Sequence, residues 1–449
     1  MKPVTFQPAQ RLEVELAKPL PDLAPATALS GERYQRAWVL VRLHSQPLGV
    51  IELKLGEAGL LAESYAPEIW LALKDTINAH LMRDGCAPVL ALTPTGLMCE
   101  DAPTCQRHRA ALLAAAPFVS VIVATRDRPI ELATALKALL AQDYPHYEII
   151  VVDNAPSTSA TAELIQHGAF DRRVRYVRED APGLAIAHNR GLLEVNAPFV
   201  AFTDDDVQVD RHWLTELVRG FSAADHVACV TGLILPAELE TPAQAWLEQF
   251  GGFTKGFAPR VFDLTEHRLD SPLYPYTAGR LGSGASMAFR TDVLRQLGGF
   301  DSALGAGTLA LGGDDLAAFF QIVSAGYQVV YQPSALLYHR HRRDYAGLRR
   351  QAYGYGVGLG AYLTQTLFEQ PRRLVDFIAR LPAGLAYTLS PRSPKNRQKQ
   401  ADYPAELTWL ERRGLLMGPL AYLRSRWRTR RRRSQFESAG LVAERLISI

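Results

Sequence analysis

The stretch FVAFTDDD at residues 199–206 is the part of the sequence from which the fold can be argued. Its apolar residues, Phe199 to Phe202, form a short run that is typical of a strand buried in a parallel sheet. Three aspartates follow, and adjacent carboxylates repel one another and resist burial. Asp204 and Asp206 alternate along an extended chain, so their side chains can point to the same side. A divalent cation would remove the conflict, because Mg²⁺ and Mn²⁺ take oxygen ligands and often share them with a substrate phosphate.

The sequence on both sides of this stretch alternates between strands and helices. An isolated acidic triplet can equally be a solvated turn after a strand, so the flanking pattern matters. The alternation predicts an α/β domain with a largely parallel sheet. Ligands of such sheets bind outside the carboxyl ends of the strands, and polar residues gather there, at 125–127, 153 and 204–206. The other predicted strands are 118–124, 148–152, 174–177, 227–235 and 284–290, and the predicted helices include 129–142 and 183–195.

A second acidic pair, Asp314 and Asp315, opens a predicted helix directly after a glycine-rich loop that begins near Gly305. Leu316 and Phe319 begin the helical spacing that marks its buried face. Aspartates at a helix start can simply be caps that complement the helix dipole. The functional alternative is a catalytic carboxylate held on a rigid helix start beneath a flexible loop.

Composition indicates an ordinary globular protein with enough apolar residues for a large core. The chain has 449 residues, of which 48% are hydrophobic and 21% charged. The formal net charge is +3, and seven arginines lie between Arg424 and Arg433, so the remainder carries 3 − 7 = −4. This is a near-neutral body with a basic tail, and we expect no nucleic acid partner. The sequence shows no run resembling a signal peptide and no apolar run long enough for a transmembrane helix.

The segments outside the α/β pattern suggest three parts: residues 1–115, 116–345 and 346–449. The first is predicted to be a small α+β module with a hairpin whose turn is Gln46-Pro47-Leu48-Gly49 and a helix over 67–82, and its role is packing or docking. The four cysteines form no CxxC pair, so free thiols in a reducing compartment are expected. The third part is predicted to be helical and to end in a basic segment beside apolar residues. That segment is either a solvated tail or a surface for an anionic membrane.

Taken in order, these motifs resemble those of glycosyltransferase family 2, whose members have the GT-A fold. The motifs are VSVIVATR at 119–126, VDN at 152–154, DDD at 204–206, GFD at 299–301 and GGDD at 312–315. The resemblance covers about half the chain, residues 118–343. It implies a Rossmann-like, mostly parallel sheet with flanking helices, here with the α+β N-terminal module and a helical C-terminal extension.

The resemblance also implies roles for individual residues. Asp204 and Asp206 match the family's DXD motif, with Asp206 as the direct metal ligand and Asp205 beside the bound nucleotide, and His339 would assist the metal or the diphosphate. Asp315 would be the general base, with Asp314 at a position where glutamate is common. The residues that would line the nucleotide pocket are Thr125, Arg126, Asp153 and Arg190.

Two departures from the family pattern bear on the function. An Ala-Arg-Asn-x-Gly pattern is common in the family, but here the arginine position is His188, with Arg190 as an uncertain substitute. Processive members carry Gln-x-x-Arg-Trp and membrane helices, whereas residues 423–427 read LRSRW and lack the glutamine. We therefore expect transfer of a single sugar rather than polymer synthesis.

The leading hypothesis is a metal-dependent, inverting glycosyltransferase of the hexosyltransferase type. It would use Mn²⁺ or Mg²⁺ and a UDP-, dTDP- or GDP-sugar, and its acceptor would be a saccharide, a lipid-linked compound or another cell-envelope molecule. The expected location is the cytoplasm, and the protein could also attach peripherally to the inner face of the membrane. The alternatives are an inactive glycan-binding or scaffold protein and a sugar-phosphate nucleotidyltransferase. The latter would want a glycine-rich loop after the first strand, where this chain has TRDRP at 125–129.

Overall fold

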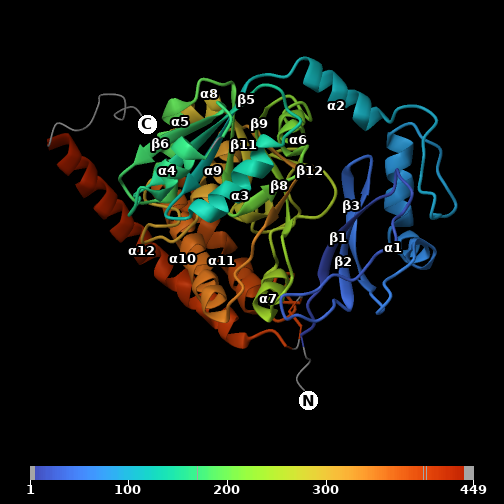
Figure 1. Cartoon of the computed structure of the whole chain (residues 1–449). Coiled ribbons are helices and arrows are strands. Elements are labelled where there is room, and N and C mark those ends of the chain that lie inside the picture. Colours follow the sequence, from blue (N-terminus) through green and yellow to red (C-terminus); the bar gives the residue numbers. More distant parts are fainter. Residues whose placement is uncertain (1–5, 169, 398, 401, 439–449) are drawn as a thin grey trace.

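A small three-stranded sheet forms the N-terminal part of the protein. The computed structural model describes residues 6–438 except 169, 398 and 401. The first elements are β1 Gln10–Glu15, β2 Arg36–Leu43, β3 Gln46–Lys54, α1 Ala62–Arg83 and α2 Thr104–Ala114. β1 and β2 are parallel, β2 and β3 are antiparallel, and α1 shares a separate apolar core with this sheet. In Figure 1 this blue module lies beside the central domain, and α2 leads from one to the other.

The central domain is built on a nine-stranded sheet. Its strands are β4 Val119–Thr125, β5 Tyr147–Asn154, β6 Val174–Glu179, β7 Phe199–Asp204, β8 Val207–Val209, β9 Val227–Pro236, β10 Arg260–Phe262, β11 Ser286–Arg290 and β12 Gln328–His339. They are arranged in the order β10-β12-β9-β11-β7-β4-β5-β6, and β8 pairs with β12. Neighbours among β6, β5, β4 and β7 are parallel, as are β9 and β12, whereas β11 is antiparallel to both of its neighbours. The mostly parallel α/β sheet expected from the sequence is confirmed.

Alternation along the strands places apolar side chains on both faces of this sheet. Ile122 and Phe202 lie in one core, whereas Val121 and Ala201 lie in the core on the opposite face. The continuous apolar runs of β4 and β7 are therefore explained, because a sheet covered on both faces has no solvated side. The helices of the domain are α3 Pro129–Leu140, α4 Ala160–His167, α5 Leu184–Glu194, α6 Trp213–Gly220, α7 Pro242–Phe250, α8 Thr291–Gln296 and α9 Asp314–Ser324, with a short 3₁₀ turn at Ala278–Arg280.

Three helices end the described chain, α10 Tyr345–Glu369, α11 Leu374–Leu389 and α12 Ala405–Ser438, with a 3₁₀ turn at Pro371–Arg373 between the first two. α10 and α12 pack against each other along glycines. A Cβ atom added to Gly356 would lie 2.0 Å from the carbonyl oxygen of Glu411, and one added to Gly418 would lie 2.5 Å from the Cα of Gly360. The two backbones therefore approach more closely than any larger residue would allow.

This close approach predicts the effect of a small substitution. Alanine favours a helix over glycine by about 1 kcal/mol, yet Gly356→Ala is expected to destabilise the protein by about 1–3 kcal/mol, because α10 and α12 must separate. Denaturant unfolding of the full chain measures the change. Gly354→Ala is the matched control, since the nearest atom to its new Cβ is 3.8 Å away. Equal stability of the two variants would contradict the packing argument.

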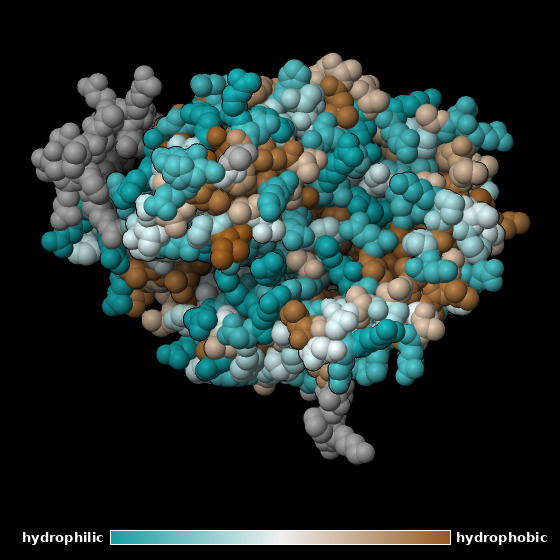
Figure 2. Space-filling model, in the orientation of Figure 1, coloured by the Kyte–Doolittle hydropathy of each residue, from teal (hydrophilic) through white to brown (hydrophobic). Residues whose placement is uncertain are grey.

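Helix α11 has no buried residue, and one of its faces is apolar and exposed. Within the described residues, no helix combines the length and the apolar character needed to cross a membrane. On the face of the molecule drawn in Figure 2, hydrophilic residues predominate and hydrophobic ones appear in separate groups. The exposed apolar residues of α11 are Leu374, Val375, Ile378, Leu381, Leu385 and Leu389.

The structure corrects two expectations about the N-terminal module. The hairpin turn is formed by His44 and Ser45, both with positive φ, and not by residues 46–49. Pro47 instead pairs with Arg42 beside an irregularity in the ladder, where a missing N–H is tolerated. Glu15 accepts hydrogen bonds from the backbone N–H groups of both turn residues, at 3.0 and 2.8 Å, and so holds the turn without glycine.

The expectation of four free thiols is also wrong. Cys86 and Cys99 form a disulfide, whereas Cys105 and Cys229 are free and buried. The two cysteines are 13 positions apart in sequence, and the chain between them turns back so that their Cα atoms are 5.5 Å apart. A spacing this long carries no motif, which is why the sequence did not indicate the bond.

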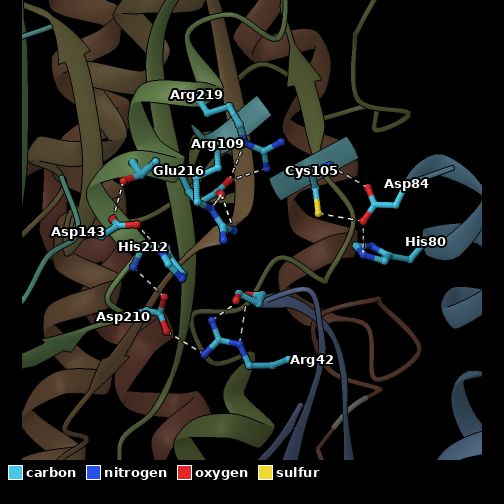
Figure 3. Close-up of polar contacts among 12 residues, drawn as sticks. Arg42, His80, Asp84, Cys105, Arg109, Asp143, Asp210, His212, Glu216 and Arg219 are labelled. Carbon is cyan, nitrogen blue, oxygen red and sulfur yellow. Dashed lines mark hydrogen bonds and ion pairs between the residues drawn. The ribbon is translucent and has the colours of Figure 1, made fainter. Parts of the chain in front are cut away.

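Buried ion pairs connect the N-terminal module to the central domain (Figure 3). Arg42 of β2 donates to Asp210, after β8, at 2.8 Å. Arg109 of α2 donates to Glu216 of α6 through two nitrogens, at 3.1 and 3.0 Å, and both side chains are almost fully buried. Removing one partner of such a pair leaves an uncompensated buried charge, so these contacts fix how the two parts sit together.

Candidate active site

The three aspartates that end β7 line a cavity of about 1040 Å³ at the carboxyl edge of the sheet. Asp204 is the last residue of β7, and Asp206 comes immediately before β8. Asp314 and Asp315, at the start of α9, line the same cavity. The two acidic pairs are more than 100 residues apart in sequence, and the topology of the sheet brings them together.

His339 joins the aspartates because of the register between β8 and β12. The antiparallel pairing sets His339 opposite Val207, the residue after Asp206. The Nε2 atom of His339 lies 3.3 Å from Oδ1 of Asp206. Ligand atoms of Asp204, Asp206 and His339 all lie within 4.8 Å of one another. The three residues that the sequence proposed for metal binding therefore form one group.

Arg128 supports the acidic turn from the side of β4. Its guanidinium donates to Asp205 at 2.5 Å and to Asp206 at 3.0 Å. The hydroxyl of Thr125 donates to the other oxygen of Asp205 at 2.7 Å. Asp205 is thus held by protein groups, whereas Asp204 has no hydrogen bond of its side chain to another described residue and faces the cavity.

Charges around the turn act on its carboxylates in opposite directions. Burial, aided by the charge of Asp206, raises the pKa of Asp204 to about 7. Burial also raises the pKa of Asp205 to about 6, against the opposing effect of Arg128. For Asp206 burial is again the largest influence, but His339 and Arg128 together outweigh it and hold its pKa below the usual range. This crowding of negative charge is what a bound cation would relieve.

Asp315 is fixed in place by two backbone hydrogen bonds. Its Oδ2 accepts from the N–H of Gly284 at 2.9 Å, and its Oδ1 accepts from that of Leu316 at 2.8 Å. Burial raises the pKa of Asp315 despite these hydrogen bonds. The carboxylate is therefore rigid and more basic than an ordinary aspartate, which suits a general base.

Asp314 lies deeper, under the glycine-rich loop. Burial and the charge of Asp315 raise its pKa to about 7. Nδ1 of His188 is 3.9 Å from Asp314, too far for a hydrogen bond, and has no hydrogen-bond partner within the described residues. Burial against Phe202 and Phe300 lowers the pKa of His188 to about 3, so this ring is neutral. At the position of the family's arginine, the chain thus offers a neutral ring.

The remaining predicted residues lie in three different settings. Arg126 is half exposed at the cavity rim. Asp153 is fully buried; the Tyr176 hydroxyl donates to its Oδ2 at 3.0 Å, and its Oδ1 has no partner in the described part of the chain. Arg190 pairs with Glu194 at 2.5 Å and lines a second cavity instead of the first. Their predicted roles in nucleotide binding stay predictions.

Arg128 and Lys255 are among the cationic residues of the cavity that had no assigned role in the sequence interpretation. Arg128 was considered only as part of the TRDRP turn, and its contact with the aspartates depends on the fold of that turn. Lys255 follows α7 in a glycine-containing segment, and burial lowers its pKa to about 8 while Asp315 opposes that shift. A single lysine among such residues gives no signal in the sequence. The contact of Arg128 with the aspartates can be inferred only once β4 is known to pair with β7.

The comparison with protein families agrees with the geometry of the site. Residues 120–291 match the model of a family described as glycosyl transferase family 2. This central segment of the chain thus has the sequence pattern of glycosyltransferase family 2. It includes all but the first residue of β4, all of β7 and the three aspartates, and it ends before Asp314 and Asp315.

Several curated proteins are distantly similar to this chain. The pre-mycofactocin glycosyltransferase of Mycobacterium tuberculosis is 24% identical over 318 residues, which are 70% of this chain and 58% of that protein. The O-antigen biosynthesis protein RfbC of Myxococcus xanthus is 28% identical over 229 residues, 50% of this chain and 17% of that protein. The chain therefore spans little more than half of the first relative's length.

A solved structure with a similar fold is the mannosyltransferase PcManGT from Pyrobaculum calidifontis in complex with GDP-Man and Mn²⁺. The match covers 68% of this chain and 87% of that one, with 19% sequence identity and a TM-score of 0.46. Similarity at this level says nothing about the sugar, the nucleotide or the metal of the protein described here.

Proposed function

We propose that the protein is a metal-dependent glycosyltransferase that moves one hexose from a nucleotide sugar to an acceptor hydroxyl, with inversion at the anomeric carbon. The observation that carries the proposal is the convergence of Asp204, Asp206 and His339 with Asp315 around one cavity of a family 2 domain.

The residues present fit a divalent cation. Two carboxylates and an imidazole suit Mn²⁺ or Mg²⁺, and the raised pKa of Asp204 reports negative charge without compensation. Asp204, Asp206 and His339 would hold the cation. When bound, such an ion supplies a Lewis acid that stabilises the diphosphate leaving group. Arg128 and Asp205 stabilise the conformation of the acidic turn.

Asp315 has the position and basicity to take a proton from the acceptor. An alcohol is a weak nucleophile at neutral pH, and removal of its proton during attack makes displacement feasible. Direct displacement at the anomeric carbon inverts its configuration. Lys255, which faces the same cavity, adds positive charge near the donor phosphates. The loop between Gly305 and Gly313 closes above the donor and excludes water, which limits hydrolysis.

For the donor we propose a UDP-, dTDP- or GDP-sugar. The buried Oδ1 of Asp153, which lacks a partner among the described residues, is an acceptor that suits an N–H group of the base or a ribose hydroxyl. Asn154, the next residue, lines the cavity. On this proposal, the carboxyl end of β5 lies on the base side of the nucleotide site.

For the acceptor we propose a lipid-linked saccharide of the cell envelope, presented at an anionic membrane surface on the cytoplasmic side. The exposed apolar residues Leu381, Leu385 and Leu389 of α11 also line the active-site cavity. On α12, exposed Leu420, Leu423 and Trp427 neighbour several arginines. An apolar face beside cationic residues is the pattern by which proteins lie on anionic lipid.

The membrane proposal predicts binding to vesicles. The protein should sediment with phosphatidylglycerol vesicles more than with phosphatidylcholine vesicles, and salt should weaken this binding. Replacing Leu385 and Leu389 with serine should reduce binding by at least about tenfold, since each buried leucine contributes roughly 1.5–3 kcal/mol. Leu90→Ser, at an even more exposed residue of the N-terminal module, is the control. If the α11 variant and Leu90→Ser lose vesicle binding to the same extent, α11 is excluded as the lipid contact.

The enzymatic proposal is tested by calorimetric titration with UDP, GDP and dTDP, each with Mn²⁺ and with EDTA. We expect one nucleotide to bind in the presence of the metal and to lose affinity in EDTA. If a folded sample binds none of the three nucleotides, the result favours the glycan-binding or scaffold alternative. The three aspartates would then be interpreted as a solvated acidic turn.

A further inference from the structure

A second group of ligand-type side chains lies in the N-terminal module, on elements that have no part in the cavity described above. It consists of His44 in the β2–β3 turn, His80 near the end of α1, Asp84 directly after α1, and Cys105 in the first turn of α2. One donor atom from each lies within 4.8 Å of all the others. All four residues are buried, with 2–6% of their surface exposed.

The contacts in this group converge on a single carboxylate oxygen. Oδ2 of Asp84 lies 2.6 Å from Nδ1 of His44, 3.1 Å from Nε2 of His80 and 2.9 Å from Sγ of Cys105. The two imidazole nitrogens are themselves only 3.2 Å apart. A carboxylate oxygen has two lone pairs and so accepts two hydrogen bonds well, but here three donor groups approach the same oxygen. Two ring nitrogens also face each other. Hydrogen bonding alone therefore does not explain this arrangement.

The surroundings hold these side chains in position. The other oxygen of Asp84 accepts the backbone N–H of Cys105 at 3.1 Å, which orients the carboxylate. His44 has φ +54, and Glu15 holds its backbone. Asp84, the residue that ends α1, follows His80 by four residues, which brings the two side chains to the same side of the helix end. Figure 3 shows the carboxylate of Asp84 facing both His80 and Cys105. It also shows Arg109, further along α2, beside Glu216 of α6.

We propose that His44, His80, Asp84 and Cys105 form a structural site for Zn²⁺. Two imidazoles, one thiolate and one carboxylate are ligands for a borderline-soft ion, whereas Mg²⁺ and Ca²⁺ prefer oxygen alone. Four protein ligands close the coordination shell, as in structural rather than catalytic zinc sites. Tetrahedral bonds of usual length would put the donors about 3.3–3.5 Å apart, so side-chain shifts of roughly half an ångström open the group to the ion.

The position of the site indicates its role. It joins the hairpin turn, the end of α1 and the start of α2, and α2 carries Arg109 into the buried pair with Glu216 of the central domain. A cation there would fasten α2 to the small sheet and fix the attachment of the module to the catalytic domain. The ion would bind with release of the Cys105 proton.

The neighbouring disulfide defines the main competing ligand set. Nε2 of His44 lies 3.7 Å from Sγ of Cys99, and reduced Cys86 and Cys99 would form a second group with His44. The proposal assigns the ion to the four-residue set and leaves the Cys86–Cys99 pair outside it. The two assignments differ in which cysteine the ion needs.

The test is metal analysis of the full chain, purified without a histidine tag, loaded with Zn²⁺ and passed through a desalting column. About one zinc per chain is expected. Loading with Co²⁺ instead should give the strong d–d bands of a tetrahedral site and a thiolate-to-cobalt charge-transfer band. Asp204, Asp206 and His339 include no sulfur, so that band separates this site from the active site. A folded chain that shows no thiolate band overturns the proposal without any variant.

Variants then assign the ligands. Cys105→Ser should lower the affinity for Co²⁺ by more than about tenfold and remove the charge-transfer band. Cys229→Ser, which alters the other buried free cysteine, should keep both. The double variant Cys86→Ser, Cys99→Ser should also keep both. If the double variant loses the band and Cys105→Ser retains it, the ion belongs to the competing set and the proposal is wrong.

Discussion

Asp315→Asn is expected to slow sugar transfer by about 10²–10⁴-fold while nucleotide binding stays unchanged, because general-base catalysis contributes about that factor. Asparagine keeps the size of the side chain and still accepts a backbone hydrogen bond, but it cannot take a proton at neutral pH. Single-turnover transfer assays and calorimetry on the same sample separate the two effects. Asp292→Asn, at an exposed aspartate in the first turn of α8, is the control and should leave both unchanged.

The same carboxylate predicts a pH dependence. Burial raises the pKa of Asp315, so the rate of transfer should fall as the pH drops through a value above the usual range of an aspartate. A base must be deprotonated to act, and lowering the pH therefore removes the active form. The asparagine variant should lose this acidic limb. A variant that keeps both its rate and its acidic limb would exclude Asp315 as the base.

Asp206→Ala is expected to abolish most of the effect of Mn²⁺ on nucleotide binding. The carboxylate is one of the three proposed ligands, with Asp204 and His339, and its loss should weaken metal-dependent affinity by more than about tenfold. The substitution also leaves Arg128 with a single acidic partner in the turn, Asp205. Titration of the nucleotide at a series of Mn²⁺ concentrations measures the effect.

A matched control distinguishes loss of a ligand from loss of charge. Asp225→Ala removes an exposed aspartate in the loop before β9 and should not alter the dependence on Mn²⁺. Circular dichroism of both variants shows that each is folded. If Asp206→Ala retains the full dependence on Mn²⁺, the ligand assignment fails, whatever the outcome for Asp315.

The central sheet was predictable from sequence because its strands are short apolar runs between polar residues. β4 and β7 are buried on both faces, so each is a continuous apolar run that can be recognised from its own residues alone. The start of α9 was predictable as well, since Asp314 and Asp315 follow a glycine that adopts a positive φ. Local rules are sufficient where local and tertiary preferences agree.

Features that depend on long-range pairing were not predictable. The bond between Cys86 and Cys99 requires the intervening segment to turn back, and Glu15 allows a turn at His44 and Ser45 that contains no glycine. α11 lies in the part that was predicted to be helical, but its amphipathic pattern does not reveal that its apolar face is exposed rather than buried. The placement of Arg190 in a different cavity from Asp206 follows from how α5 packs, which its own sequence does not reveal.

Helix α10 contacts both α12 and the loop that precedes Asp315. At both contacts the backbones pack closely at glycines. A Cβ added to Gly313 would lie 2.5 Å from the carbonyl oxygen of Gly358, just as Gly356 meets Glu411 on the other side. A displacement of α12 is therefore expected to shift α10 and, through it, the loop that precedes Asp315. Thermodynamic linkage then makes the coupling mutual: if a surface that binds α12 changes donor affinity by some factor, the donor changes affinity for that surface by the same factor. Two tight helix contacts would thus connect any surface that binds α12 to the loop in front of Asp315.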